Sequence, residues 1–275
     1  MTNTNKINTF ACPLFLVDNV SEKIIEHYHS DFVLLHAIAG RSECTIAGEK
    51  IRFGAGDYVL LARNNFSKIH IFPDKDTGTH KGILIRISEE EIRKYFLHNK
   101  QAIKHGGVHK TEPYRLLPPH PLLQGLFASV EICLSQGYRY DSETMILMKL
   151  YETIETLVTI DPELYGWLFY ANADPGKINL ADFMNKNYIF NAPLERFAEL
   201  SGRSLSTFRR DFIKEFGMTP SAWLLDRRLE EAYRQITAEK KKPSEIYLHL
   251  GFESLAHFTR SFKNKYTVTP ASLLR

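Results

Sequence analysis

The chain contains the same pattern twice, fifty residues apart, and this internal repeat restricts its fold more than any other feature. Residues 193–220 align with residues 243–270 without a gap, and ten of the 28 aligned positions are identical. The identical pairs include Phe208 with Phe258, Arg210 with Arg260, and Pro220 with Pro270. A match of this length without insertions indicates a duplicated structural unit.

The first copy has the pattern of two short helices joined by a tight turn. A short helical segment begins at Pro193, "SGR" forms the turn, and Ser204 is suited to cap the second helix. That helix is expected to end at Gly217. Its apolar residues recur at helical spacing and predict a buried face of Leu205, Phe208, Phe212 and Phe216. This is a helix-turn-helix layout.

The second copy repeats the plan. Ser254 is the expected cap, and the predicted buried face consists of Leu255, Phe258, Phe262 and Tyr266. The faces left open are polar or small: Ser206, Thr207, Arg209, Arg210 and Lys214 in the first copy, and Ala256, His257, Thr259, Arg260 and Lys263 in the second. An ordinary helical hairpin would explain either copy alone. Two gapless copies with an exposed arginine at the same place favour double-stranded DNA as partner, because arginine binds guanine bidentately or holds phosphate.

Residues 219–236, between the copies, read as one long helix. Its inward residues are expected to be Trp223, Leu225, Leu229, Ala232, Tyr233 and Ile236. The helix would be about 27 Å long, near the ~34 Å of one DNA turn, so both second helices can enter successive major grooves. Arg227 and Arg228 have two readings, phosphate contact or solvated charge.

Charge is divided unevenly along the chain. Residues 175–275 hold 17 Lys and Arg against 11 Asp and Glu, a charge of +6, whereas residues 1–174 hold 18 against 21, a charge of −3. The basic part coincides with the repeat and suggests a polyanionic partner.

The N-terminal part is rich in short β-type runs from Leu14 to Ser88, separated by turn material such as "AGR" and "GAGD". This spacing predicts an antiparallel barrel or sandwich. Ser88 and Glu91 then form a capping-box pattern. Further helical patterns follow at 121–136 and 142–158.

The sequence lacks paired cysteines, a secretory signal pattern and long apolar runs, and these absences indicate the expected compartment. Cys12, Cys44 and Cys133 are isolated, which argues against a disulfide framework and a zinc knuckle. No secretory signal pattern opens the chain, and no run approaches 18 apolar residues. A cytoplasmic protein without membrane contact is expected.

Residues 178–275 resemble the DNA-binding domain of the AraC/XylS family of bacterial transcription regulators. The likeness is carried by "LSTFRRDFIKEFGMTPSAWL" and "GFESLAHFTRSFKNKYTVTPASLLR". It implies two helix-turn-helix units, 193–217 and 243–267, joined by a long helix. It also implies that residues early in each second helix face the bases. Those residues are Ser206, Arg209 and Arg210 in the first unit, and Leu255, Ala256, His257 and Arg260 in the second.

The sequence departs from the family pattern at four places. Thr267 stands where a helix-ending glycine is usual, and Tyr247 replaces a small residue. Leu255 and Ala256 stand where polar residues are common. The second unit therefore either reads thymine methyl groups or mainly holds phosphate.

The resemblance also implies the overall plan, an α+β protein. Residues 1–172 would form a cupin-like sensor and dimerisation domain, with an antiparallel barrel at about 10–88 and helices at about 88–172. Residues 173–177 would be a linker, and 178–275 the all-α DNA-binding domain. The expected function is transcription activation under control of a small-molecule or protein effector, with RNA polymerase as a partner and a homodimer as a possible assembly.

A metalloenzyme is the alternative, because some cupins are metal enzymes. His27 and His29 share a strand face and could meet one metal, but the remaining ligands of a cupin motif are not evident. Surface or pocket-rim histidines are the expected reading, with His70 and His80 uncommitted. No catalytic motif is present, so neither enzyme activity nor a cofactor is expected. A DNA-repair methyl acceptor would need a zinc-bound thiol cluster, which three scattered cysteines do not offer.

Overall fold

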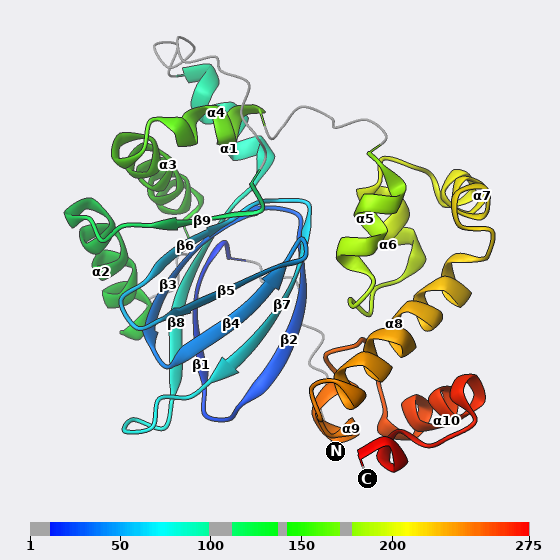
Figure 1. Ribbon diagram of the computed structural model, residues 1–275. Helices are drawn as coiled ribbons and strands as arrows, with labels where there is room; N and C mark the ends of the chain where they lie inside the picture. Colours follow the sequence, from blue (N-terminus) through cyan, green and yellow to red (C-terminus); the bar gives the residue numbers. More distant parts are fainter. Residues whose placement is uncertain (1–11, 99–111, 137–141, 171–177, 275) are drawn as a thin grey trace.

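The computed structural model describes residues 12–98, 112–136, 142–170 and 178–274. An antiparallel β domain with four helices comes first, and an all-α domain follows (Figure 1). The predicted α+β class is confirmed. The predicted linker at 173–177 and the first residues of the predicted barrel lie outside the described residues.

Within the described residues, nine strands form two antiparallel sheets that face each other, and together they make up the barrel. The five-stranded sheet runs in the order β1 (Leu14–Asn19), β8 (His80–Ile87), β3 (Phe32–Ala39), β6 (Tyr58–Leu61), β9 (Tyr114–Leu117). The four-stranded sheet runs in the order β2 (Lys23–His29), β7 (Asn65–Phe72), β4 (Arg41–Ile46), β5 (Glu49–Gly54). The strand β9 was not predicted from the sequence, because it is four residues long and lies within the range expected to be helical.

The two sheets enclose an apolar core because inward and outward side chains alternate along each strand. Val33 and Leu35 of β3 meet Cys44 and Ile46 of β4 there. Burial raises the pKa of the Cys44 thiol to about 12, so this residue packs as a small apolar group.

Four helices cover the outer face of the five-stranded sheet: α1 (Glu89–His98), α2 (Pro121–Ser135), α3 (Glu143–Ile160) and α4 (Glu163–Tyr170). The predicted capping box begins α1. The Ser88 N–H donates to a Glu91 carboxylate oxygen at 2.8 Å, and the Glu91 N–H donates to the Ser88 hydroxyl at 3.3 Å. The helices bury the outward isoleucines of β8, among them Ile83 and Ile85.

The C-terminal domain has both predicted helix-turn-helix units. It consists of α5 (Leu180–Asn187), α6 (Leu194–Leu200), α7 (Leu205–Phe216), the linker helix α8 (Pro220–Thr237), α9 (Pro243–Ile246), α10 (Leu255–Tyr266) and a final 3-10 turn, Pro270–Leu274. Three predicted core positions are wrong. Leu225 and Tyr233 are exposed, with Leu224 buried instead, and Leu255 is also exposed.

The outer face of β2 and β7 packs against the first helix-turn-helix unit. The Phe66 ring lies 5.2 Å from Phe190 and 5.2 Å from Phe197, measured between centroids. The Arg196 guanidinium lies 4.4 Å above the Tyr28 ring. The barrel therefore contributes directly to the core of the C-terminal domain.

The second helices of the two units end in the same way on different residues. Gly217 ends α7 with a φ of 70°, and its N–H bonds to the Ile213 carbonyl. Thr267 ends α10 with a φ of 63°, and its N–H bonds to the Lys263 carbonyl. A left-handed backbone is natural for glycine and strained for a β-branched residue. The departure seen in the sequence thus leaves the motif intact and adds local strain.

We expect Thr267→Gly to stabilise the chain by about 0.5–1 kcal/mol, since relief of left-handed strain outweighs the entropy that glycine loses on folding. The matched variant is Gly217→Thr. A Cβ at Gly217 would meet nothing within 4 Å, so only backbone strain acts there and destabilisation of about 1–2 kcal/mol is expected. Urea unfolding followed by helical circular dichroism measures both, and a destabilising Thr267→Gly would contradict the account.

Candidate nucleic-acid interface

The start of α7 is held by a small polar network. The Ser204 hydroxyl accepts the Thr207 N–H at 3.3 Å and the Thr207 hydroxyl at 3.0 Å, and it lies 3.2 Å from the Ser206 hydroxyl. Arg203 pairs with Asp211 at 3.1 Å and donates to the carbonyls of Ser201 and Ile178. The first turn of α7 is therefore fixed relative to α5 and to the preceding turn.

The predicted residues of α7 lie at the surface. Ser206, Arg209 and Arg210 are exposed, and Thr207 is half-buried. The Arg210 side chain is 75% exposed, and its Nε lies 3.6 Å from an Asp211 carboxylate oxygen. Such a surface pair holds the guanidinium weakly, which leaves it able to reach a phosphate or a base edge.

The predicted residues of α10 occupy the same places on their helix. Leu255, Ala256, His257 and Arg260 are exposed, and Thr259 is half-buried. The Ser254 hydroxyl caps the helix by accepting the His257 N–H at 3.2 Å. This face offers two apolar side chains, an imidazole and, one turn later, a guanidinium.

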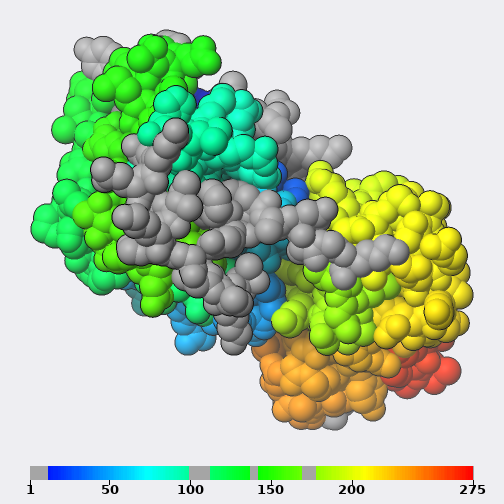
Figure 2. All heavy atoms as spheres, turned by 90° about the horizontal axis from the view of Figure 1, so that it is seen from above, coloured from blue at the N-terminus to red at the C-terminus, as the bar shows by residue number. Residues whose placement is uncertain are grey.

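Both helices lie on the side of the C-terminal domain that faces away from the β sheets (Figures 1 and 2). Phe208 and Phe258 are fully buried at equivalent positions, and this orients the repeated arginines Arg210 and Arg260 outward from both units. The linker helix α8 runs between them and has 18 residues, as the sequence predicted to within one residue at each end.

Ile213, on the open face of α7, was not predicted from the sequence as an exposed residue. This side chain is 49% exposed and follows Arg209 and Arg210 by one helical turn. An apolar residue in an apolar-periodic helix is normally assigned to the core, so the sequence offered no signal. On a helix that meets DNA, such a side chain can contact a thymine methyl group.

The structure shows that both roles predicted for Arg228 are wrong. Its side chain is half-buried, and its guanidinium donates to the carbonyls of Tyr188 at 2.7 Å, Phe190 at 2.7 Å and Gly251 at 3.1 Å. Arg228 is therefore neither a phosphate contact nor a solvated charge. Arg227 pairs with Glu230 at 2.8 Å near the surface.

His27 and His29 lie together with ring centroids 4.9 Å apart. His29 is buried and bonds through Nε2 to the Ser67 hydroxyl at 2.6 Å. Burial lowers the pKa of His29 to about 3, and burial together with Arg86 lowers the pKa of His27. Across residues 12–98, 112–136, 142–170 and 178–274, no three His, Cys, Asp or Glu side chains are grouped to hold a metal ion.

His70 and His80, the other two histidines considered from the sequence, are also hydrogen-bonded. His80 bonds to Ser42 at 2.8 Å, and His70 pairs with Glu22 at 2.6 Å.

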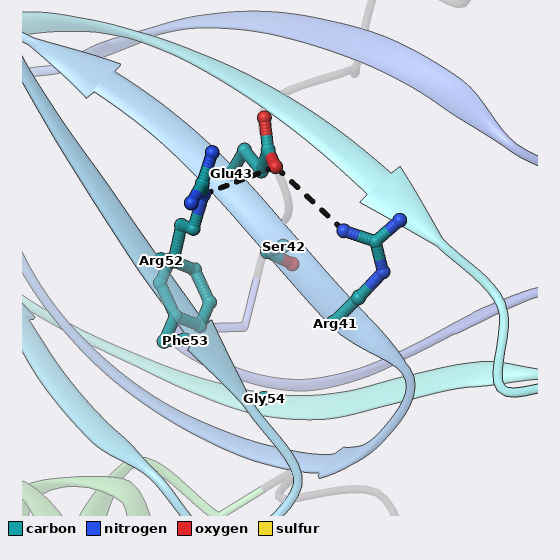
Figure 3. Close-up of a pocket in the computed structure, with 6 residues that line it drawn as sticks. All are labelled: Arg41, Ser42, Glu43, Arg52, Phe53 and Gly54. Carbon is teal, nitrogen blue, oxygen red and sulfur yellow. Dashed lines mark hydrogen bonds and ion pairs between the residues drawn. The ribbon is translucent and has the colours of Figure 1, made fainter.

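A groove of about 280 Å³ lies over β4 and β5 (Figure 3). Glu43 sits between two arginines there, 3.2 Å from Arg52 and 3.6 Å from Arg41. The Arg41 guanidinium also stacks on the Phe72 ring at 3.9 Å. Both cations already have partners, so the groove is not a ready anion site.

Comparison with known proteins identifies the C-terminal part. A family model described as a helix-turn-helix domain matches residues 197–275. The virulence regulon transcriptional activator VirF of Yersinia enterocolitica is 33% identical over 92 residues, 34% of each chain. The regulator ExsA of Pseudomonas aeruginosa is 30% identical over 89 residues, 32% of each chain. The XylDLEGF operon transcriptional activator of Pseudomonas putida is 28% identical over 109 residues, 38% of this chain and 34% of the relative.

The C-terminal domain is similar to transcription regulators of the AraC/XylS type. Each match spans about a third of the relative's length. Among solved structures, an apo variant of ToxT from Vibrio cholerae aligns over 95% of this chain and 96% of its own, with 12% identity and a TM-score of 0.42. The similarity to AraC/XylS-type regulators rests on the sequence matches to the C-terminal domain.

We expect substitution of the two repeated arginines to reduce DNA affinity in different ways. Arg210→Ala should cost about 1–3 kcal/mol at the specific site and relax preference at one or two base pairs. Arg260→Ala should weaken binding more uniformly across sequences and lower the salt slope by about one unit, because its neighbours Leu255 and Ala256 are apolar. Binding of both variants to a library of randomised sites at two salt concentrations measures the difference.

Phe208→Ala is the control, because loss of a fully buried ring costs about 3–5 kcal/mol and should unfold the first unit. Equal, sequence-independent losses for both arginine variants would show that neither side chain reads bases. Unchanged affinity for both would show that the interface lies elsewhere.

Proposed function

We propose that this chain is a sequence-specific DNA-binding transcription regulator, and that it acts as an activator. The observation that carries the proposal is the pair of helix-turn-helix units with equivalent arginines exposed on one side of the domain. The matched relatives are named as transcriptional regulators or activators, which supports the same conclusion. Activation implies contact with RNA polymerase at the promoter.

The proposed contacts to DNA come from both second helices. In α7 they are Ser206, Thr207, Arg209 and Arg210, and in α10 they are Leu255, Ala256, His257, Thr259 and Arg260. With a helix of 18 residues between the units, the footprint should span roughly two helical turns of DNA. A footprint of the full chain on its own upstream region tests this assignment directly.

The proposed division of labour places DNA binding in residues 178–275 and signal input in residues 1–172. We propose that the N-terminal part binds a small-molecule or protein effector and performs no chemistry. His29, His70 and His80 form hydrogen bonds with serine or glutamate, and His27 lies beside His29, which disfavours the alternative of a metalloenzyme. Stoichiometric metal in the purified chain, with activity lost on chelation, would favour that alternative instead.

A cytoplasmic location is proposed because the promoter lies there. Within the described parts of the chain, no helix is both long and apolar enough to cross a bilayer.

We expect a fragment of about residues 175–275 to fold alone and bind DNA. Among the described residues, the core of its second unit consists of C-terminal residues, and the core of its first unit includes Phe66 as the one buried residue of the barrel. Gel shifts at low salt measure the binding, because phosphate contacts strengthen as salt falls. The fragment 1–172 is the matched control. A folded C-terminal fragment with no greater DNA affinity than this control would contradict the assignment.

We also propose that α3 pairs two subunits. Met145 and Met148 on this helix are exposed, the latter by 67%. Met148→Lys should therefore weaken self-association, measured by sedimentation at tens of micromolar protein. Leu97→Lys, on α1 and equally exposed at 67%, should leave association unchanged. A chain that stays monomeric with and without DNA would contradict pairing.

A further inference from the structure

Lys68 is a buried lysine at the contact between the two domains. It lies on β7, its side chain is 4% exposed, and its Nζ donates to three carbonyls of the C-terminal domain. The acceptors are Ile189 at 3.1 Å, Leu248 at 3.2 Å and His249 at 2.8 Å. A buried ammonium is stable only with its protons bonded, so this placement is a built contact rather than a chance approach.

The three acceptors come from the segment that leads into the first helix-turn-helix unit and from the second unit itself. Ile189 lies in the connection between α5 and α6, at the base of the first unit. Leu248 and His249 lie in the turn between α9 and α10 of the second unit. One side chain of the barrel therefore bridges both units at once.

Arg228 of α8 bridges the same two segments from within the C-terminal domain, through the carbonyls of Tyr188, Phe190 and Gly251. The segments are already in close contact. Gly251 has a φ of 78°, and a Cβ there would lie 2.7 Å from the Ile189 carbonyl oxygen. The junction is tightly packed. A change at either Lys68 or Arg228 should therefore shift the two units relative to each other.

Glu26 of β2 completes the junction. Its carboxylate pairs with Lys68 at 2.5 Å and accepts the Asn191 N–H at 2.8 Å. Asn191 in turn donates through its side chain to Glu253 of the second unit at 2.9 Å. The barrel thus holds the first unit through Glu26, and both units through Lys68.

We propose that Lys68 is a positioning residue for DNA recognition, which sets the separation of α7 and α10 and hence the spacing of the base pairs that the chain selects. The separation of two DNA-reading helices fixes the spacing of their half-sites. Lys68 contacts the C-terminal domain on the side opposite to α7 and α10. It therefore acts on these helices through the junction. The inference rests on the proposed function.

The test uses the full chain and a duplex that the wild-type chain selects from a randomised library. Further duplexes carry one or two base pairs inserted or deleted between the two protected halves, and one carries a single half. The wild type should lose about tenfold in affinity on the shifted duplexes, a typical coupling between sites. Lys68→Met should lose no more than about threefold on them while binding the single-half duplex like the wild type.

Three controls separate positioning from loss of structure. Lys68→Arg keeps a donor group and should restore most of the spacing preference. Lys81→Met removes an exposed lysine of β8 that pairs with Asp18, and it should behave as wild type. Should Lys68→Met fail to fold in a thermal melt, Glu26→Gln replaces it. That variant keeps an acceptor for Asn191 but removes the charge partner of Lys68, and should also relax the spacing preference.

The proposal is overturned if the folded variants keep the wild-type penalty on shifted duplexes, or if they lose affinity equally on all duplexes including the single half. A wild-type chain that selects no duplex would overturn the proposed function as well. A spacing preference that weakens selectively supports the positioning role.

Discussion

The arrangement of this molecule depends on two cations, the buried Lys68 and the half-buried Arg228, that meet backbone carbonyls at one junction. Lys68 and Arg228 together contact six carbonyls, three each, in the segments 188–190 and 248–251. Removing a charge from water costs several kcal/mol unless hydrogen bonds replace the lost hydration. Each cation is satisfied only when both segments are in place, so the junction favours a single relative placement of barrel, linker helix and both helix-turn-helix units.

The two units are attached to the barrel by different forces. The first unit shares an apolar core with it, since Phe66 packs against Phe190 and Phe197. The second unit has a core of its own, and the described buried residues of this core all lie between positions 229 and 262. It meets the barrel through hydrogen bonds to the Lys68 ammonium. Apolar burial tolerates small shifts, whereas hydrogen bonds require defined geometry. A structural change in the barrel should therefore displace the second unit before the first.

Local sequence predicted what depends on local chemistry. The repeat spacing located both units, and Ser204, Ser254 and Gly217 mark helix ends that the structure confirms. Leu224 and Leu225 could not be told apart, because neighbouring leucines differ only by about a quarter turn of helix. Lys68 gave no signal at all. In "NFSKIHIF" it occupies an outward polar position, and its partners lie 121 to 181 residues away in the chain. Contacts of this kind exist only once the domains have met.

The second unit differs from the first in three independent ways. Its first two exposed helical residues are apolar, and its last helical turn ends on a strained Thr267. Among the described residues, its buried core contains no barrel side chain. Under the proposed function, α7 supplies the side chains suited to base reading, with Arg209, Arg210 and Ile213 on one face. The second unit offers fewer such groups but is placed by Lys68. Its contribution to selectivity then comes more from where it meets the DNA than from which bases it contacts, because phosphate contacts report position and not sequence.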